Sequence, residues 1–504
     1  MTDDLPHDAR ILAAAREADL SSVFRARGVV ARTGDGVAQV AGLTRVAYEE
    51  LVGFDSGALG LAFDLRADST GVLLLSGAEA VRAGEGVVGL ARLPELPVGP
   101  ATLGRVIDPL GNPLDDGGPL PELPRCELFR PAPELIERKA VDAPLRTGVF
   151  VIDAAIPIGR GQRELIIGDR NVGKTALAED AIVAQTAGDV ACVYVVIGQA
   201  MSRVLTLRET LLRAGALQNT AIVAADASMP PGMRYLAPYA GASVAEWFRD
   251  QGGHALVVYD DLTKHADAYR ELSLLMDRPP GREAFPGDVF FIHAELLERA
   301  AARNAAAGGG SVTALPLVET TESDIAAYIP TNIISITDGQ IYLDTARFAR
   351  NERPAVDIGR SVSRIGGAAQ PAPVQIAARN LRILHSRFEE LESLARVGLE
   401  LETGLAQEIA RGRLLRALLR QPRLSPRGIA QQVLGVLAVS EGWLDGLAPE
   451  QAPRFVESLV ARVRSEEPGT ASRLERGELP EGDWVERIRA NAAALGSAAQ
   501  EERP

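Results

Sequence analysis

The sequence predicts a multidomain protein in which a small β-barrel, an α/β nucleotide-binding core and an α-helical bundle follow one another. Three observations support this fold class. Short apolar runs separated by turns occupy residues 25–92, strand-like runs alternate with helical patterns over 93–370, and helical periodicity covers 371–504. A length of 504 residues suggests two to four domains, and 46% hydrophobic residues suffice for packed cores.

The barrel prediction depends on three short alternating runs. They cover residues 29–40, 50–54 and 71–75, and turn residues separate them. Strands of this length and spacing favour a small closed barrel. The preceding segment, residues 1–24, contains a short amphipathic pattern over 9–20. A helix there could dock a partner or could stay solvated and fray, and the sequence does not separate the two.

Prolines at 94, 97 and 100 mark the exit from the barrel into the core. Over residues 93–370, the alternation of strand-like and helical patterns predicts a parallel sheet covered by helices on both faces. The run 366–373, rich in Gly and Pro, interrupts this pattern. Beyond it we expect helices with one apolar face, which begins with Leu381, Ile383, Leu384, Phe388, Leu391, Leu394 and Ala395.

The acidic composition argues against broad binding to nucleic acids or anionic membranes. The formal net charge is −14 and the pI is about 5.1, so the average surface does not attract a polyanion. No apolar run reaches the roughly 18 residues that span a bilayer, and the acidic N-terminus resembles no signal or transit peptide. These features predict a bacterial cytoplasmic location. We expect Cys126 and Cys192 to be reduced packing residues, and the scattered histidines predict no zinc site.

Lysine is rare in this chain, and one lysine lies in a phosphate-binding motif. Only three of the 53 lysine and arginine residues are lysines. A compact ammonium fits between phosphate oxygens where the planar guanidinium of arginine fits badly, so the placement of a lysine is informative. Lys174 belongs to a G-x-x-x-x-G-K-T loop. We therefore predict a nucleotide-binding loop made of Gly168, Asp169, Arg170, Asn171, Val172, Gly173, Lys174 and Thr175.

The surroundings of this loop support the motif. Residues 164–167 form a strand-like run before it, and residues 176–183 form a helical pattern after it. Gly168 and Gly173 allow the backbone to curl so that N–H groups point at phosphates, and the helix N-terminus adds its dipole. Thr175 is expected to offer its hydroxyl to Mg²⁺. The predicted ligand is ATP or ADP with Mg²⁺.

A second apolar strand ends in two carboxylates, as a magnesium site requires. Residues 255–259 are apolar, and Asp260 and Asp261 follow them. In a parallel sheet such a strand brings its acid to the edge where the phosphate loop lies, where the acid can hold Mg²⁺ directly or through water. We assign this metal-binding role to Asp260. Asp261 is the better candidate for the cap of the next helix.

Four segments of the chain together resemble the alpha subunit of F-type ATP synthases. They cover residues 158–170, 278–290, 327–341 and 354–363, and the resemblance runs from about 25 to at least 450. It implies a six-stranded barrel, a RecA-like P-loop core and a C-terminal helical bundle. It also implies a regulatory, non-catalytic subunit that binds Mg-ATP and alternates with beta subunits in a hexamer around the gamma subunit. Stator subunits would complete the complex.

The same resemblance implies a place in the cell and a coupling function. The chain would lie on the cytoplasmic face of the bacterial inner membrane as a peripheral subunit, in contact with the membrane only through the assembled complex and without nucleic acid. The complex would couple ATP synthesis or hydrolysis to the transport of protons or sodium. An atypical or alternative bacterial form stays open, because Asn171 and Val172 replace the usual Gln-Thr and Ala200 and Met201 replace the usual Lys-Arg. These changes also leave the nucleotide affinity open.

One residue distinguishes the alpha from the beta subunit in this resemblance. In the catalytic beta subunit a Glu follows the strand after the P-loop helix and polarises the attacking water, whereas this chain has Gln199 there. A neutral amide can orient water but cannot act as a carboxylate does, so we expect binding of Mg-nucleotide without turnover. Because some GTPases hydrolyse with a Gln, this interpretation depends on the family.

The resemblance also implies roles for residues outside the P-loop. Arg364 matches the arginine finger that acts in trans on the γ-phosphate of the neighbouring beta subunit. Ser361, in the signature before it, is assigned with Arg364 to the catalytic residues. Arg353, Pro354 and Gln421 match residues that line the adenine pocket.

Two other functions stay open. The nearer alternative is a catalytic subunit of a related rotary or secretion ATPase, which would hydrolyse ATP as an isolated chain. The remote alternative is a hexameric RNA translocase, which also joins a barrel to a P-loop core. It would need basic and aromatic surfaces, whereas this chain is acidic and only 5% aromatic.

Overall fold

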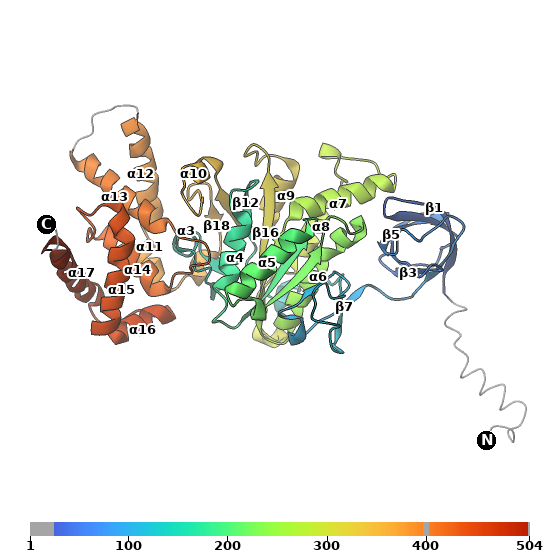
Figure 1. The fold of residues 1–504 in the computed structure, drawn as a ribbon, viewed down its shortest axis with the longest axis horizontal. Coiled ribbons are helices and arrows are strands. Elements are labelled where there is room, and N and C mark those ends of the chain that lie inside the picture. The colour runs from blue at the N-terminus through green and yellow to red at the C-terminus, as the bar shows by residue number, and fades with distance from the viewer. Residues whose placement is uncertain (1–24, 397–402, 502–504) are drawn as a thin grey trace, which may run out of the picture.

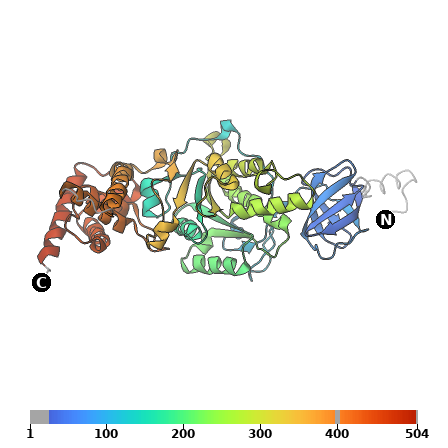
Figure 2. The ribbon, with the colours of Figure 1, turned by 90° about the horizontal axis from the view of Figure 1, so that it is seen from above.

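The computed structural model describes residues 25–396 and 403–501. Three regions follow one another along the long axis, with the barrel at one end, the α/β core in the middle and the C-terminal helices at the other end, and both views agree (Figures 1 and 2). This arrangement confirms the predicted fold class. Within the described ranges, no helix is long and apolar enough to cross a membrane. The amphipathic pattern over 9–20 lies outside the described residues.

The N-terminal region is a closed antiparallel barrel of six strands in the order β1-β2-β5-β4-β3-β6. Alternate side chains point inward and pack as one apolar cluster that includes Val40, Val52 and Val72, each essentially inaccessible to solvent. This period of two is the pattern that predicted the strands. The strands are β1 (Arg27–Gly34), β2 (Val37–Ala41), β3 (Leu51–Phe54), β4 (Leu59–Leu65), β5 (Ser69–Ser76) and β6 (Gly86–Gly89).

The core contains an eight-stranded sheet in the order β18-β17-β12-β16-β15-β13-β14-β8. Every neighbouring pair is parallel except β17 and β18, which are antiparallel. The strands are β8 (Val106–Ile107), β12 (Glu164–Asp169), β13 (Val190–Ile197), β14 (Thr220–Ala225), β15 (His254–Asp260), β16 (Ser311–Thr320), β17 (Gly339–Leu343) and β18 (Val362–Ser363). Two-stranded sheets flank it, formed by β7 (Glu95–Pro97) with β9 (Arg125–Glu127) and by β10 (Pro144–Leu145) with β11 (Ile158–Gly159).

Helices cover both faces of this sheet, as the sequence predicts. One apolar cluster packs one face against α3 (Phe150–Ala155), α4 (Lys174–Val183) and α5 (Met201–Arg213). A second cluster packs the other face against α6 (Pro231–Asp250), α7 (Leu262–Leu275), α8 (Val289–Glu298) and α9 (Tyr328–Ile336). The central strands are therefore buried on both sides and consist mostly of apolar residues. Cys192 lies in one of them, is buried and is a free thiol, and Cys126 is also free.

The C-terminal region is helical, and its apolar core continues into the first face of the sheet. Its helices are α11 (Ala372–Ala378), α12 (Leu381–Arg396), α13 (Thr403–Leu419), α14 (Ile429–Ser440), α15 (Ala452–Glu466), α16 (Pro468–Arg476) and α17 (Trp484–Glu501), preceded by the short α10 (Thr345–Ala349). The predicted apolar face of α12 is partly wrong. Leu381 and Phe388 are buried, but Ile383 is 62% exposed and Leu394 is 42% exposed. The buried face instead includes His385.

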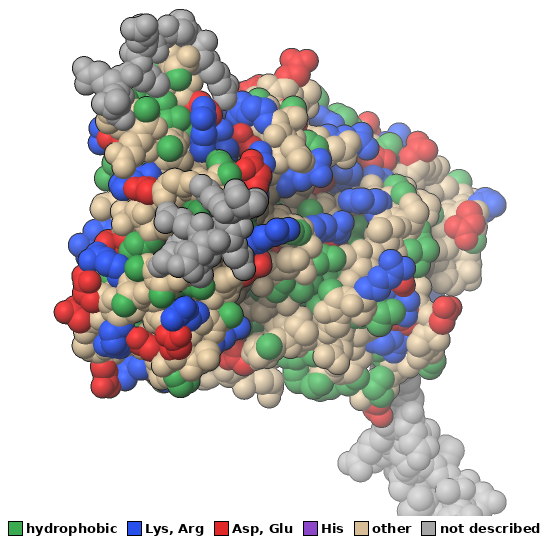
Figure 3. All heavy atoms as spheres, turned by 60° about the vertical axis from the view of Figure 1, so that its left-hand side comes forward, with side chains coloured by type: hydrophobic (Ala, Val, Ile, Leu, Met, Phe, Trp, Pro, Cys, Tyr) green, Lys and Arg blue, Asp and Glu red, His purple; other side chains and the backbone are tan. Residues whose placement is uncertain are grey.

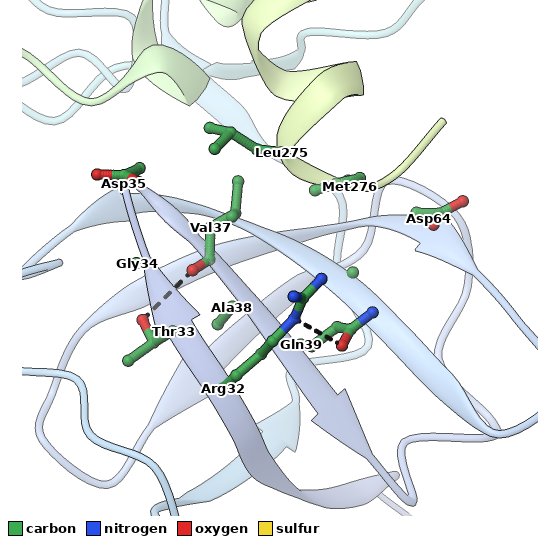
Figure 4. Close-up of a pocket in the computed structure, with 11 residues that line it drawn as sticks. Arg32, Thr33, Gly34, Asp35, Val37, Ala38, Gln39, Asp64, Leu275 and Met276 are labelled. Atoms are coloured by element: carbon green, nitrogen blue, oxygen red, sulfur yellow. Dashed lines mark hydrogen bonds between the residues drawn. The ribbon is translucent and has the colours of Figure 1, made fainter. Parts of the chain in front are cut away.

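A small cavity marks the junction between the barrel and the core. It has a volume of about 170 Å³ and lies between the β1-β2 hairpin and the end of α7 (Figure 4). Val37 points toward Leu275 across it, and Arg32 donates to Gln39 on its barrel side. Arg32 also pairs with Asp277 beyond α7, with 2.7 Å between Nη2 and Oδ2. Polar contacts thus tie the barrel to the core at a point remote from the predicted P-loop.

Candidate nucleotide-binding site

The predicted P-loop joins the C-terminal end of β12 to the N-terminus of α4. Asn171 (φ 63°) and Gly173 (φ 105°) both have left-handed backbone conformations, which Asn and Gly adopt more readily than other residues. Gly168 serves a different purpose, because a Cβ there would lie 2.6 Å from the carbonyl oxygen of Leu343 in β17. Val172 is buried and packs inside the loop. The curled loop leaves Lys174 as the first residue of α4.

Lys174 lies beneath the loop rather than in solvent. Its Nζ donates to the backbone carbonyls of Gly168, at 2.8 Å, and Asp169, at 2.7 Å. Burial lowers the pKa of this ammonium, while the carboxylates of Glu319, Asp261 and Asp260 oppose the shift. The cation is therefore held at the base of the loop, where phosphate oxygens would meet it.

Asp169 braces the loop from behind. Its carboxylate accepts hydrogen bonds from the Thr320 hydroxyl at 2.6 Å, from the Ser323 backbone and hydroxyl, and from Thr345. Partial burial alone would raise the pKa of Asp169, but these hydrogen bonds hold the pKa below its usual value. Asp169 thus lies in the loop as predicted, but its side chain anchors the loop to β16 and α10 and does not face the cleft.

The structure brings Thr175 and Asp260 together, as the magnesium prediction requires. The Thr175 hydroxyl donates to Asp260 Oδ2 at 3.0 Å, and the buried Tyr194 hydroxyl donates to the same oxygen at 2.7 Å. Burial raises the pKa of Asp260, and the neighbouring charge of Asp261 adds to the shift. A hydroxyl and a carboxylate beside a phosphate-binding loop fit Mg²⁺, which prefers few protein oxygens together with substrate phosphates. Asp261 accepts from the backbone N of Lys264 and caps α7, which matches its predicted role.

Gln199 lies next to Thr175 and Asp260, at the end of the site where Mg²⁺ is predicted. It follows β13 after Gly198, and its Nε2 donates to the backbone carbonyl of Asp260 at 3.1 Å. The amide is therefore fixed close to Thr175 and Asp260, at the place where the family resemblance puts the catalytic Glu of the beta subunit. A carboxamide there has no charge with which to activate water.

These residues line one cleft of about 560 Å³. Its walls carry five cations and four carboxylates, and side chains of both signs also mix on the surface that Figure 3 shows. Several of the lining residues were not predicted from the sequence. A single Arg or Glu carries no signal in a chain with so many, whereas the rarity of lysine could have pointed to Lys264. These unpredicted charged residues are Glu179, Arg203, Lys264, Glu319 and Arg423.

The three predicted adenine-pocket residues lie together, but they do not line this cleft. The backbone N of Gln421 donates to the Arg353 carbonyl at 2.9 Å, and the cis Arg353–Pro354 bond follows. The Gln421 amide is buried and its groups bond to Gly148, Phe150 and Ser425. Arg423, two residues further on, lines the cleft instead and pairs with the buried Glu179 of α4.

Arg364 lies at the end of the sheet opposite the P-loop, whereas Ser361 contacts Tyr342, which pairs with Ile167 one residue before Gly168. Ser361 is buried, donates to the Asp357 carbonyl at 2.6 Å and accepts from the backbone N of Tyr342, so its hydroxyl fixes a turn and does not face solvent. Arg364 follows β18 and is exposed. Ser363 pairs with Gly339 at the start of β17, whereas the P-loop end of β12 pairs with Leu343 at its end. At about 3.3 Å per residue, roughly 13 Å of strand separates the two ends.

Comparison with known proteins agrees with this geometry. The model of the ATP synthase alpha/beta family, nucleotide-binding domain, matches residues 148–363, and that of the ATP synthase alpha/beta chain, C terminal domain, matches 370–494. The chain is 49% identical over 441 residues to ATP synthase subunit alpha of Aquifex aeolicus, covering 88% of each chain. The chain belongs to the family of ATP synthase alpha subunits.

Two further relatives match most of the chain. ATP synthase subunit alpha 2 of Burkholderia thailandensis is 48% identical over 502 residues, which cover 97% of this chain and 90% of the relative. ATP synthase subunit alpha 1 of Paraburkholderia xenovorans is 49% identical over 465 residues, which cover 92% and 91%. The alpha-subunit family thus extends over the barrel, the P-loop core and the helical region, and confirms the resemblance predicted from the sequence.

Proposed function

We propose that this chain is a non-catalytic, regulatory subunit of a rotary F-type ATP synthase, which binds Mg-nucleotide and supplies Arg364 to a neighbouring catalytic site. The separation of Arg364 from the chain's own P-loop carries this proposal. The guanidinium is exposed at one end of the central sheet, while Lys174, Thr175 and Asp260 gather at the other end.

The chain's own cleft is suited to hold a nucleotide. Lys174 and the P-loop backbone would bind the phosphates of ATP or ADP, and Thr175 and Asp260 would hold Mg²⁺, which neutralises phosphate charge when it is bound. Gln199 would orient water without removing its proton. Arg423 extends over the same cleft from the C-terminal region, while Arg353, Pro354 and Gln421 would support that edge from behind.

Arg364 has the properties of a residue that acts on a partner. Among the described residues it forms no ion pair with a carboxylate, and its side chain donates only to the Thr337 carbonyl, at 3.2 Å. Its backbone is fixed by a hydrogen bond to the Asp338 carbonyl, at 3.0 Å. A guanidinium with free donors on a fixed backbone can reach a γ-phosphate across a subunit interface. Ser361 would position it by fixing the turn before β18.

The proposed partners, location and coupled transport are those that the family implies. We propose that the chain alternates with beta subunits in a hexamer around a gamma subunit, held by stator subunits, on the cytoplasmic face of the bacterial inner membrane. The complex would couple ATP synthesis or hydrolysis to proton or sodium transport. The chain itself would contact neither nucleic acid nor lipid.

Replacement of the proposed finger tests this function. In a reconstituted complex with beta and gamma subunits, Arg364→Ala should reduce multisite ATP hydrolysis by about 10³-fold or more, the range for arginine fingers, while the complex still assembles. The matched control is Arg213→Ala, which removes an exposed arginine of α5 that pairs only with Glu209 on the same helix. Unchanged turnover in Arg364→Ala would refute the trans role. Hydrolysis by the purified chain alone would favour a catalytic subunit instead.

A further inference from the structure

A fully buried carboxyl lies behind the strand that carries Arg364. Glu164 begins β12, at the end opposite the P-loop, and none of its surface is accessible to solvent. Gln162 Nε2 donates both to Glu164 Oε2, at 2.7 Å, and to the hydroxyl of Ser363, at 3.0 Å. Because Ser363 directly precedes Arg364, one hydrogen-bond chain joins this carboxyl to the proposed finger.

One oxygen of this carboxyl has no partner. Within the described part of the chain, Glu164 Oε1 is buried without a hydrogen bond, whereas buried polar atoms almost always have one. The opposing residue is Gly339, where a Cβ would lie 2.5 Å from Oε2 and 2.8 Å from Oε1. The glycine therefore leaves room for the carboxyl, and an acceptor remains available for a donor that can reach it.

The charged groups near Glu164 identify that donor. Asp338 already pairs with Arg163, with 2.9 Å between Oδ1 and Nη2. Arg382 already donates to the carbonyls of Ala155, at 3.0 Å, and Ser361, at 2.8 Å. Arg382 is thus held by two backbone carbonyls, whereas the exposed Arg364 side chain donates to a single backbone carbonyl among the described residues, so Arg364 is the less constrained of the two cations.

The protonation state of Glu164 would decide whether this acceptor attracts a cation. Burial raises the pKa of Glu164 well above its usual value, and Asp338 adds to the shift, while Gln162, Arg364 and Arg382 oppose it. The carboxyl is thus neutral at a pH where an exposed glutamate is ionised, and becomes an anion as the pH rises further.

We propose that Glu164 is a positioning residue for Arg364, and that its ionised carboxylate draws the guanidinium back from the subunit interface. This inference rests on the trans role of Arg364 proposed above. When the carboxyl is neutral, Arg364 is free to extend toward the neighbouring nucleotide. When the carboxyl is charged, its free oxygen competes with the γ-phosphate for the same donors.

The test is the pH profile of ATP hydrolysis by the reconstituted complex. Glu164→Gln keeps the shape of the side chain and an oxygen that can accept from Gln162 Nε2, but it cannot ionise. As the pH is raised we expect wild-type turnover to fall, and Glu164→Gln to retain about tenfold more of its activity at the alkaline end of the series. The control is Glu49→Gln, because Glu49 in the barrel also has a raised pKa but lies far from Arg364. Its profile should follow the wild type.

Three outcomes would separate this inference from the proposed function. Identical profiles for Glu164→Gln and wild type would overturn the inference, even if Arg364→Ala abolishes turnover. Mg-ADP affinity of the isolated chain should be the same in both, since the P-loop lies at the other end of β12, and a loss of affinity would point to a general structural role instead. If Glu164→Gln does not assemble, Glu164→Asp replaces it as the test variant, because the shorter side chain moves the carboxylate away from Arg364 by one methylene. A loss of activity at alkaline pH equal to that of wild type would then contradict the proposal.

Discussion

At the end of the cleft where Mg²⁺ is predicted, two hydroxyl groups donate to one carboxylate oxygen. Thr175 and Tyr194 both bond to Asp260 Oδ2, at 3.0 Å and 2.7 Å. Thr175 lies in the helix after the P-loop and lines the cleft, so bound nucleotide and Mg²⁺ would compete with Asp260 for the Thr175 hydroxyl. Tyr194 also borders the cleft, but it is buried in β13 and its hydroxyl reaches Asp260 from within the sheet. Tyr194 therefore keeps Asp260 oriented toward the site.

Removal of the Tyr194 hydroxyl should weaken Mg²⁺-dependent binding. A hydrogen bond to a charged group contributes about 1.5 to 3 kcal/mol, and Asp260 would lose an orienting partner, so we expect Tyr194→Phe to lower the Mg-ADP affinity of the isolated chain by about tenfold. Affinity for ADP measured with a chelator should change little. Titration calorimetry with and without Mg²⁺ measures both.

The matched control for this variant is Tyr259→Phe, since Tyr259 is equally buried on the neighbouring strand but packs on the opposite face of the sheet. If both variants lost the same affinity, the hydroxyl of Tyr194 would have no specific role.

At the residue scale, the sequence predicts the groups that belong to a motif and misses those that do not. Lys174, Thr175 and Asp260 follow from spacing, because the strand-loop-helix unit and the parallel sheet bring them to one edge. Tyr194 looks like any apolar strand residue in the sequence. Asp169 is in the motif, but the hydrogen bonds that its carboxylate accepts from Ser323 join residues 154 positions apart in the sequence. Only the fold reveals such long-range partners.

At the scale of elements, the contact between the barrel and α8 contains a titratable group. Glu49, in the loop between β2 and β3, has a pKa raised to about 7, first by burial and then by the charge of Glu295 on α8. The proton therefore binds the folded protein more tightly than the unfolded chain. The stabilisation that protonated Glu49 gives the folded state is complete below about pH 4.5, the usual pKa of an exposed glutamate. It is lost as the pH rises through 7.

Substitution of Glu49 should therefore remove a pH-dependent loss of stability. After allowance for partial solvent screening, we expect Glu49→Gln to be more stable than wild type by about 1 to 2 kcal/mol at pH values near 8. Near about pH 5 the two should differ by less. Scanning calorimetry at both pH values measures the shift in melting temperature. The exposed Glu79 of the same barrel supplies the control Glu79→Gln, and an equal shift in that variant would show that net charge alone is responsible.

Helix and strand periodicity predicted the order and type of the elements better than their faces. β2 and β6 of the barrel alternate as expected, because each has one buried side. β4 and β5 are buried on both faces, because their outward-facing side chains pack against the core. In α12, Ile383 and Leu394 fit a helical stripe in the sequence, yet both are exposed. Periodicity identifies a helix but cannot show which apolar residues find a neighbour to pack against, since the neighbouring helices come from distant segments. The C-terminal bundle was thus predicted as a class and not as a packing arrangement.

At the scale of the whole molecule, the central sheet separates two chemical groups. One end of β12 carries the P-loop and its lysine, and the other end carries Glu164 beneath the strand of Arg364. In the proposed function the chain would hold one nucleotide and contribute a cation to another without the two sites sharing a side chain. Sequence resemblance implied this division of roles, but the distance between the two ends follows from strand pairing that no single motif contains.

A structure of the assembled complex with nucleotide bound to the adjoining subunit measures this division most directly. The decisive quantity is the distance from the Arg364 guanidinium to the γ-phosphate of the neighbour. We predict a hydrogen-bond distance of about 3 Å, with the chain's own nucleotide held by Lys174 and Thr175. An Arg364 side chain that pointed into solvent, away from any nucleotide of the adjoining subunit, would contradict the account.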